Sequence, residues 1–339
     1  MSPRLPGQIK TVPEDFCVWE IPANAPAGEG DHRMLWIEKR GLSTPHLLTE
    51  IARRTGLRSR DLGIAGRKDK WALTQQWVSL PLQLGANESG LPSDGESVTV
   101  AEGWFRILNR DLHPRSLKTG QLRGNRFAIV VRGLDAEQEQ LLMARVEAVI
   151  AEGRMLNPFG EQRFLDPEAL AQAAALLRRG RMSGRKDRFL LSIAQAAVFN
   201  RYMTLRDAAE VVDGEWYGTA GGGRFDGARE EQPALLERLR SGEIVPLGPM
   251  PGRDVQPVGT CHDLLDQAQR ELGLEGSDWS AFGKKLRGTW RPLWVPLNDL
   301  TAEPTDDGPR LSFSLPSGSY ATVLLERLLE GSWVIPSNS

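Results

Sequence analysis

Strand-like segments gather near the two ends of this chain, and the long stretch between them is mainly helical. The strand-like runs lie at 10–21, where Pro13 interrupts the run, and at 34–39, 62–65, 76–82, 96–100, 104–109, 126–131, 293–297 and 310–316. The helical patterns of the middle lie at 167–179, 190–207, 263–271 and 279–286. A sheet that draws strands from both ends of a chain leaves the middle as an insertion. We therefore predict an α+β fold in which one domain carries an inserted, mainly helical domain.

The changes of pattern also predict the domain boundaries. A helix that begins at the capping-box pair Asp135 and Gln138 ends at Gly153, and strand-like residues return near Trp294. We predict a core made of 1–153 and 294–339, with the insertion at 154–293. The length of 339 residues exceeds the usual size of a single domain, which agrees with this division.

Composition excludes several classes of protein. A mean hydropathy of -0.35, with no apolar run near the ~18 residues of a membrane span and no apolar segment of signal-peptide type near the start, predicts a cytoplasmic protein that does not enter membranes. The two cysteines and four histidines lack the spacing of metal sites, so we expect no bound metal. The net charge of -2 does not by itself indicate a nucleic-acid binder, but basic residues cluster at 53–70, 115–132 and 178–188 and are compatible with one basic face.

Asp69 lies in a short basic loop between two strand-like runs. Arg67, Lys68 and Lys70 flank it, and nearby cations favour the ionised form of a carboxylate. Such a carboxylate can act on a sugar carbon, as it does in retaining glycosidases. An aspartate among lysines is more often a surface turn, and the letters GRKD recur at 184–187 in an arginine-rich linker between two predicted helices. The flanking strands favour Asp69 over the second copy as a catalytic residue.

The run GRKDKWALTQQW at 66–77 resembles the signature of the TruD family of transfer-RNA pseudouridine synthases. In that family a glycine, a basic pair and the catalytic aspartate precede an alanine, a threonine and a Gln-Trp pair. Five further runs resemble family motifs in the family's order: IKTVPEDF at 9–16, GNRF at 124–127, NPFGEQRF at 157–164, VFN at 198–200 and LPSGSYAT at 315–322. Six ordered motifs over nearly the whole chain are far more specific than any one of them.

The resemblance implies a fold and an activity. It implies a pseudouridine-synthase fold with a mixed, mostly antiparallel sheet and helices, and it implies that 154–293 is the family's insertion domain. It implies an isomerase, without a metal or organic cofactor, that acts on transfer RNA, at uridine 13 in the bacterial members. Asp69 then either attacks C1′ of the ribose or removes the C2′ proton to form a glycal, and the sequence leaves both routes open. Nothing in the sequence indicates more than a monomer.

The resemblance also assigns roles to the side chains around Asp69. Lys10 matches a lysine expected to pair with the catalytic aspartate, so both are expected in the catalytic apparatus. The residues expected to bind the substrate uridine are Phe16, Asn125, Tyr320, Glu14 of the PEDF motif, and Phe127, which replaces a tyrosine of other pseudouridine synthases. An aromatic ring offers a flipped uracil a stacking face, and an asparagine amide can bond its imide edge. Without the resemblance, the two phenylalanines would be interpreted as core residues and Asn125 as a turn residue.

Two other functions stay open at this point. A non-catalytic RNA-binding module could retain the same scaffold, although an intact basic loop around Asp69 argues against it. A glycoside or nucleoside hydrolase would need a second carboxylate as general acid, for which Glu14 is the nearby candidate. Formation of pseudouridine, RNA binding without it, and release of free uracil distinguish the three.

Overall fold

The computed structural model describes residues 4–101, 103–164, 166–206, 210–219 and 222–331. It divides into two compact units, which are taken separately below. Unit 1 consists of Met1–Gly153 and Pro296–Ser339, and unit 2 of Arg154–Val295. Across the part of the chain that the structure describes, no helix is both long enough and apolar enough to cross a membrane.

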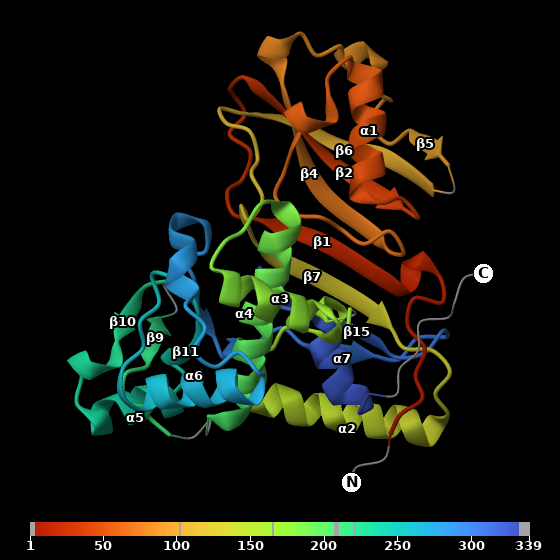
Figure 1. Cartoon of the computed structure of the whole chain (residues 1–339). Helices are drawn as coiled ribbons and strands as arrows, with labels where there is room; N and C mark the ends of the chain where they lie inside the picture. The colour runs from red at the N-terminus through yellow and green to blue at the C-terminus, as the bar shows by residue number, and fades with distance from the viewer. Residues whose placement is uncertain (1–3, 102, 165, 207–209, 220–221, 332–339) are drawn as a thin grey trace. The chain divides into compact units, whose positions relative to one another are not determined.

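Unit 1 is built on a nine-stranded sheet in the order β14-β15-β7-β1-β4-β2-β6-β5, with the short β3 pairing with β4 (Figure 1). The strands are β1 (Phe16–Pro22), β2 (His32–Arg40), β3 (Gly63–Ile64), β4 (Leu73–Pro81), β5 (Ser97–Val100), β6 (Gly103–His113), β7 (Leu122–Val130), β14 (Thr301–Glu303) and β15 (Arg310–Pro316). β1 runs parallel to β4 and antiparallel to β7. The β7–β15, β2–β4 and β2–β6 pairs are also antiparallel. The predicted α+β class with a mixed, mostly antiparallel sheet is confirmed.

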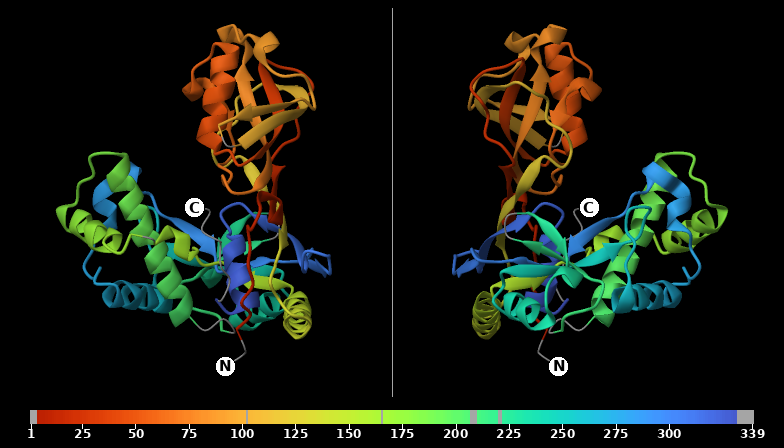
Figure 2. Two further views of the ribbon diagram at one scale, coloured as in Figure 1. Left: turned by 90° about the vertical axis from the view of Figure 1, so that its right-hand side faces the viewer. Right: turned by 90° about the vertical axis from the view of Figure 1, so that its left-hand side faces the viewer.

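The described part of unit 1 contains three α-helices, at least one of which packs against its strands. α1 (Thr44–Thr55) runs alongside β2, β4 and β6, and the side views of Figure 2 show it on one side of these strands. Its apolar residues Leu47 and Ile51 are fully buried there. α2 (Ala136–Glu152) and α7 (Ala321–Leu329) lie next to one another. Short 3-10 turns connect the elements at Pro13–Asp15, Ser59–Asp61, Leu82–Leu84 and Glu88–Gly90.

Local chemistry explains where α1 and α2 begin and end. The Ser43 side chain accepts from the N–H of His46 at the start of α1, and Gly56 ends it in the left-handed conformation, with φ of 73°. Asp135 and Gln138 form the predicted capping box of α2, and Gly153 ends it with φ of 64°. The helix predicted from the capping box at Asp135 and from Gly153 is therefore confirmed.

Unit 2 combines helices with a second sheet. Its helices are α3 (Ala169–Arg179), α4 (Arg185–Leu205), α5 (Gln232–Arg240) and α6 (Gly259–Glu271). A four-stranded sheet has the order β10-β9-β11-β12, with β9 (Trp216–Thr219), β10 (Arg224–Asp226), β11 (Ile244–Met250) and β12 (Thr289–Pro292). Two short strands at the domain boundary, β8 (Arg154–Leu156) and β13 (Trp294–Pro296), pair with each other. Turns of 3-10 helix lie at Glu161–Arg163, Gly227–Arg229 and Trp279–Lys285.

The core of unit 2 surrounds α4 and contains a buried polar network. Leu191, Ala194 and Phe199 of α4 are fully buried in this core. The Tyr202 hydroxyl donates to Glu215 Oε1 over 2.9 Å, and the Arg206 guanidinium bonds both oxygens of the same carboxylate. Because a buried charge must be paired, this network specifies how α4 meets the segment before β9.

Several local predictions differ from the structure. Residues 10–15 do not extend the first strand, because Pro13 opens a 3-10 turn and β1 begins at Phe16. The second GRKD run is not a linker, since Gly184 caps α4 and Arg185 begins it. The run 279–286 forms 3-10 turns rather than an α-helix. The helix predicted over 190–207 ends at Leu205, and Asp207 lies outside the described residues.

The predicted helical middle also contains strands that the pattern missed. β9 ends within the glycine-rich stretch 218–227 and β10 lies inside it; residues 220 and 221 of this stretch lie outside the described residues. β11 has the sequence IVPLGPM, and its two prolines and glycine are unusual in a central strand. Helices and strands thus share unit 2.

Candidate active site

Asp69 lies in the segment between β3 and β4 of unit 1, which has no regular secondary structure. The segment alternates in exposure: Arg67, Asp69 and Trp71 are exposed, and Lys68 and Ala72 are buried. Side chains of an extended segment point alternately to opposite sides. One side of the loop is therefore packed against the protein, and the other side faces solvent.

Both oxygens of the Asp69 carboxylate have donors from the protein. Lys10 Nζ forms a short ion pair with Oδ2, and the backbone N–H of Trp71 donates to Oδ1 over 3.2 Å. The Lys10 side chain is 11% exposed and that of Asp69 42% exposed, so the carboxylate faces solvent while its cation does not. Lys10 has a left-handed φ of 58°, which costs a residue with a Cβ ~1 kcal/mol. The surrounding contacts thus hold Lys10 in place against its backbone preference.

A second lysine supports the backbone of Asp69. Lys39 of β2 is fully buried, and its Nζ donates to the carbonyl oxygen of Asp69 over 2.6 Å. Burial lowers the pKa of Lys39 to about 8, while the charge of Asp69 opposes that shift. Lys39 therefore fixes the peptide at Asp69 as Lys10 fixes the carboxylate.

The buried side of the loop is anchored by an ion pair and a hydroxyl. Lys68 Nζ lies 2.8 Å from Glu20 Oε2, and the two side chains are 4% and 1% exposed. The hydroxyl of Thr44, the first residue of α1, accepts from the N–H of Lys68 over 2.9 Å and lies 3.1 Å from Gln76 Oε1. β1, β4 and α1 thus converge on the residue before Asp69.

The aromatic residues predicted to bind uridine lie beside this loop but are covered. Lys10 Nζ lies 4.3 Å from the centre of the Phe16 ring, which meets Phe127 edge to face at 6.2 Å. Phe127 stacks on Phe313 of β15 at 5.2 Å. Phe16 is 6% exposed and Phe127 7%. The rings form an apolar wall next to Lys10 and Asp69, and they offer a base little free surface in this conformation.

Asn125 of β7 has an unused acceptor. It lies opposite Glu20 in the β1–β7 pairing, so the two side chains leave the same face of the sheet. Its Oδ1 is buried and has no hydrogen-bond partner among the described residues. A buried acceptor without a donor costs ~1–3 kcal/mol and therefore suits a donor that a ligand brings.

Two of the predicted site residues are less closely tied to Asp69. Glu14 forms a bidentate pair with Arg40, at 2.5 and 3.2 Å, and this pair holds the pKa of Glu14 below its usual value. Tyr320 stands at the N-terminus of α7, four residues after Pro316, which lies opposite Gly124 in the β15–β7 pairing. The structure therefore brings together Asp69, Lys10, Phe16 and Phe127. Glu14 is instead paired with Arg40.

The second GRKD motif has a different environment. Asp187 lies in the first turn of α4, where its Oδ2 accepts from the N–H and the hydroxyl of Ser183 over 2.8 and 2.9 Å. These bonds lower the pKa of Asp187. Its ion-pair partner is Arg179, 3.4 Å away, rather than a lysine held as Lys10 is. The Asp187 carboxylate therefore accepts hydrogen bonds from Ser183, which precedes α4, and has a structural role at the start of this helix.

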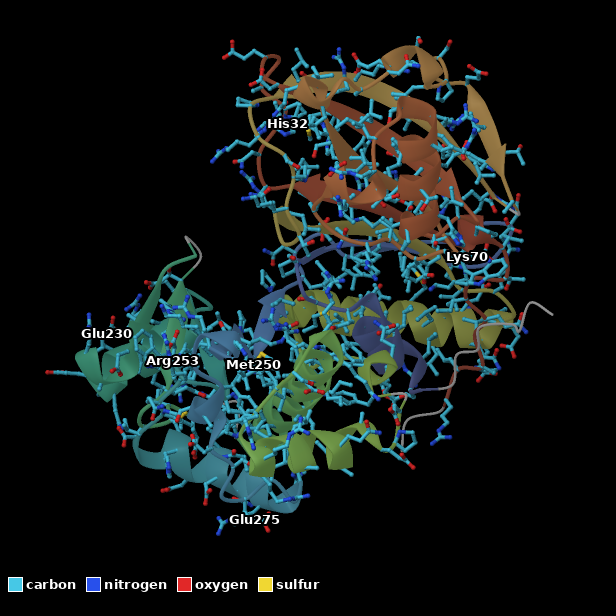
Figure 3. The ribbon with its side chains drawn as sticks, turned by 45° about the horizontal axis from the view of Figure 1, so that its top comes forward. His32, Lys70, Glu230, Met250, Arg253 and Glu275 are labelled. Carbon is cyan, nitrogen blue, oxygen red and sulfur yellow. The ribbon has the colours of Figure 1, made fainter. Side chains whose placement is uncertain are left out.

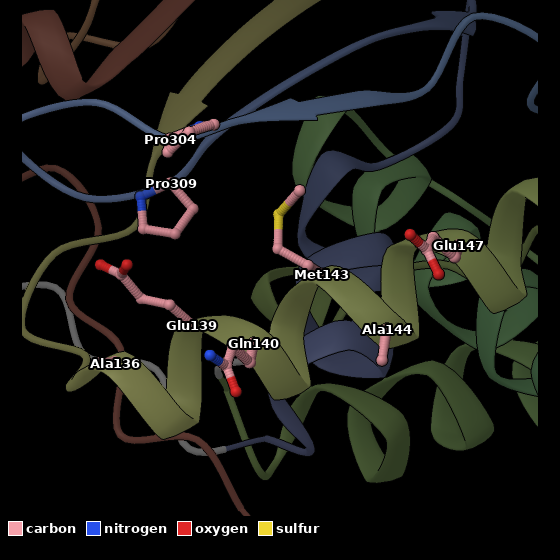
Figure 4. A pocket seen from close by; sticks show the side chains of 8 residues that line it. All are labelled: Ala136, Glu139, Gln140, Met143, Ala144, Glu147, Pro304 and Pro309. Atoms are coloured by element: carbon pink, nitrogen blue, oxygen red, sulfur yellow. The ribbon is translucent and has the colours of Figure 1, made fainter.

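Neither the surface hollows nor any cluster of metal-ligand residues in the described part of the chain adds a residue to this site. A groove of about 410 Å³ lies between α2 and the prolines next to β14 and β15 (Figure 4), and none of the candidate residues lines it. A hollow of about 240 Å³ reaches Gly124, the residue before Asn125. Among the described residues, no group of three or more His, Cys, Asp or Glu side chains could hold a metal ion.

Sequence reasoning did not single out two of the supporting residues, Lys39 and Glu20, the partner of Lys68. Lys39 and Glu20 stand in the apolar runs MLWIEK and FCVWEI, where a charged residue in a buried strand is itself a signal. The pattern does not reveal which side of the sheet each side chain faces or which partner it meets.

Comparison with known proteins identifies the family of the chain. A family model described as tRNA pseudouridine synthase D (TruD) matches residues 1–169 and 181–328. Proteins named tRNA pseudouridine synthase D from Thermus thermophilus and Anaeromyxobacter dehalogenans are each 35% identical, over 97% of this chain and over 90% and 95% of their own lengths. A solved structure of a TruD-type protein from Methanosarcina mazei shares the fold, with a TM-score of 0.70 and 21% identity over 98% of this chain and 95% of that one. The chain therefore belongs to the tRNA pseudouridine synthase D (TruD) family.

Proposed function

We propose that this protein converts uridine 13 of transfer RNA to pseudouridine, as a monomer and without a metal or organic cofactor, with Asp69 as the catalytic carboxylate. The observation that carries the proposal is the setting of Asp69: a half-exposed carboxylate whose two oxygens are held by Lys10 and by the N–H of Trp71. Family membership and the names of the relatives support the substrate class.

The reaction rearranges bonds without changing composition. The bond from N1 of uracil to C1′ breaks, uracil turns, and a bond from C5 to C1′ forms, while C5 loses a proton and N1 gains one. Asp69 either attacks C1′ and is later displaced by C5, or takes the C2′ proton to give a glycal and returns it. Both routes need one ionised, oriented carboxylate next to the ribose, and the two donors on Asp69 support that state.

The neighbouring residues suit a flipped uridine. The unpartnered Oδ1 of Asn125 can accept from N3–H of uracil, which would satisfy a buried acceptor. Phe16 and Phe127 can bound the pocket as an apolar wall, and a small displacement of either ring would expose a face for stacking. In this proposal Lys10 orients the carboxylate, and Tyr320 and Glu14 border the substrate.

The state of Glu14 favours an isomerase over a hydrolase. A general acid needs a carboxyl group with a raised pKa, whereas the bidentate pair with Arg40 lowers the pKa of Glu14. An ionised Glu14 cannot protonate a leaving group. This leaves Asp69 as the one carboxylate that the proposed mechanism employs.

The two GRKD motifs offer a matched test. Transfer RNA is treated with the wild-type protein, Asp69→Asn and Asp187→Asn, and pseudouridine is mapped at each position. Asp69→Asn is expected to form none and still to bind RNA, while Asp187→Asn is expected to modify uridine 13 as the wild type does. Full activity of Asp69→Asn would exclude the mechanism, and modification elsewhere than at uridine 13 would exclude the proposed target.

A further inference from the structure

Trp71 is an exposed aromatic residue inside the loop that carries Asp69. Trp71 is 39% exposed, whereas most large apolar residues of unit 1 are buried. Lys70 Nζ lies 4.8 Å from the centre of the Trp71 ring (Lys70 is labelled in Figure 3). An indole beside an ammonium group combines a stacking surface with a positive charge.

The position of Trp71 is fixed relative to the carboxylate. Its backbone N–H donates to Asp69 Oδ1 over 3.2 Å, and two residues of chain span at most ~7 Å. The anchors of Lys68, which are Glu20 and Thr44, hold the same loop from its buried side. The ring therefore stands within about one nucleotide's reach of any ribose that Asp69 contacts.

We infer that Trp71 and Lys70 form a platform for the nucleotide next to the target uridine: its base stacks on the indole, and its phosphate pairs with the ammonium group. This inference rests on the proposed function. A flipped uridine leaves its neighbours unstacked, and an exposed aromatic ring replaces part of the lost stacking. Arg67, exposed on the other side of Asp69, extends the positive charge along the loop.

The charges around the ring favour RNA over a protein partner. Arg67, Lys68 and Lys70 flank Asp69 along the loop, and Lys68 pairs with Glu20 on its buried side. An exposed indole next to basic side chains matches a strand of bases and phosphates, since aromatic stacking and basic side chains are the usual contacts with single-stranded nucleic acid.

The test uses transfer RNA with 2-aminopurine at position 12 or 14 and the full-length protein in the Asp69→Asn background, so that no turnover is needed. Trp71→Ala is expected to weaken RNA binding by about five- to a hundredfold, the range for one stacked base, and to abolish the quenching of 2-aminopurine at one of the two positions. Trp71→Phe, which keeps a ring, should restore most of both. Phe189→Ala removes a 57% exposed aromatic residue of α4 and serves as the control, with no change expected.

Kinetics and salt separate this role from a structural one. With Asp69 intact, Trp71→Ala should raise KM and leave kcat within about threefold, because the lost contact is made in both the ground state and the transition state. Lys70→Gln should reduce the slope of log Kd against log salt by ~0.7, the value for one phosphate contact with a single strand.

These measurements test the proposed platform separately from the catalytic role of Asp69. Unchanged RNA affinity and unchanged quenching in Trp71→Ala would overturn the inference, as would a loss of kcat alone, which would make Trp71 a positioning residue for Asp69. Equal effects of Trp71→Ala and Phe189→Ala would also overturn it. If Asp69→Asn kept full activity while Trp71→Ala still lost affinity and quenching, the proposed mechanism would fail and the platform would stand.

Discussion

Replacing Lys68 with methionine should destabilise β1 and β4 far more than the loss of one ion pair at the surface would. Lys68 and Glu20 are 4% and 1% exposed and their charged atoms lie 2.8 Å apart, so the variant leaves a buried carboxylate that keeps, among the described residues, the N–H of Trp77 as a donor at 3.3 Å. Removing one partner of a buried pair costs ~3–5 kcal/mol. At ~1.36 kcal/mol per factor of ten, amide exchange in these strands should become roughly a hundred- to several thousandfold faster.

Hydrogen exchange measured by mass spectrometry on peptides from β1 and β4 is the appropriate assay, because it reports local stability in a chain with two units. The double variant Glu20→Leu/Lys68→Met removes both charges and should recover most of the protection, since well-packed apolar residues often replace a buried pair without loss. Arg58→Met, which breaks the exposed pair with Asp61, is the control and should leave exchange in β1 and β4 unchanged.

The reasoning would be refuted by a Lys68→Met variant whose exchange rises less than about threefold, which would mean that water already solvates Glu20. It would equally be refuted by a double variant that is no better protected than Lys68→Met. In that case the Lys68 stem, rather than its charge, would anchor the loop.

Three further predictions concern other parts of the molecule. Gly124→Ala should lower the melting temperature, because a Cβ there would lie 2.1 Å from a carbonyl oxygen of β15, whereas Gly184→Ala, with open space around it, should not. The free energy of unfolding should rise between about pH 8 and pH 10, on the order of 3 kcal/mol, since burial lowers the pKa of Lys39 to about 8 and the unfolded chain therefore binds more protons in that window; a Lys39→Met variant with the same pH dependence in urea titrations would contradict this. Tyr202→Phe should destabilise unit 2 by ~1–3 kcal/mol in thermal melts, because Glu215 loses a buried donor, and an unchanged melting curve would show that water or another group replaces it.

The parts of the fold that sequence reasoning predicted are those specified by neighbouring residues. α2 is bounded by the capping box of Asp135 and Gln138 at one end and by the left-handed Gly153 at the other, and these signals act within one turn of the chain. β11 was missed because its sequence contains Pro246, Gly248 and Pro249, and its strand conformation depends on pairing with β9 and β12. Local propensity contains no information about such partners.

Sequence reasoning could propose the residues of the candidate site, but it could not predict how they are arranged in space. The ion pair between Lys10 and Asp69 joins residues 59 positions apart, and the resemblance to a family suggested it where spacing could not. The pairing of Glu14 with Arg40, 26 positions away, and the burial of Lys39 under Asp69 depend on the register of β1, β2 and β4. Register follows from the assembled sheet, so these contacts become visible in three dimensions.

The place of β15 in the sheet of unit 1 bears on how the protein is made. β15 pairs with β7, yet β7 ends at Val130 and β15 begins at Arg310, 180 residues later (310 − 130). At ~5–20 residues per second, a ribosome needs roughly 9–36 s to cover that distance. During this time β7 presents unpaired N–H and C=O groups, the kind of edge that recruits strands from other chains. Synthesis of the whole of unit 2 therefore coincides with the period in which aggregation competes most directly with completion of the sheet.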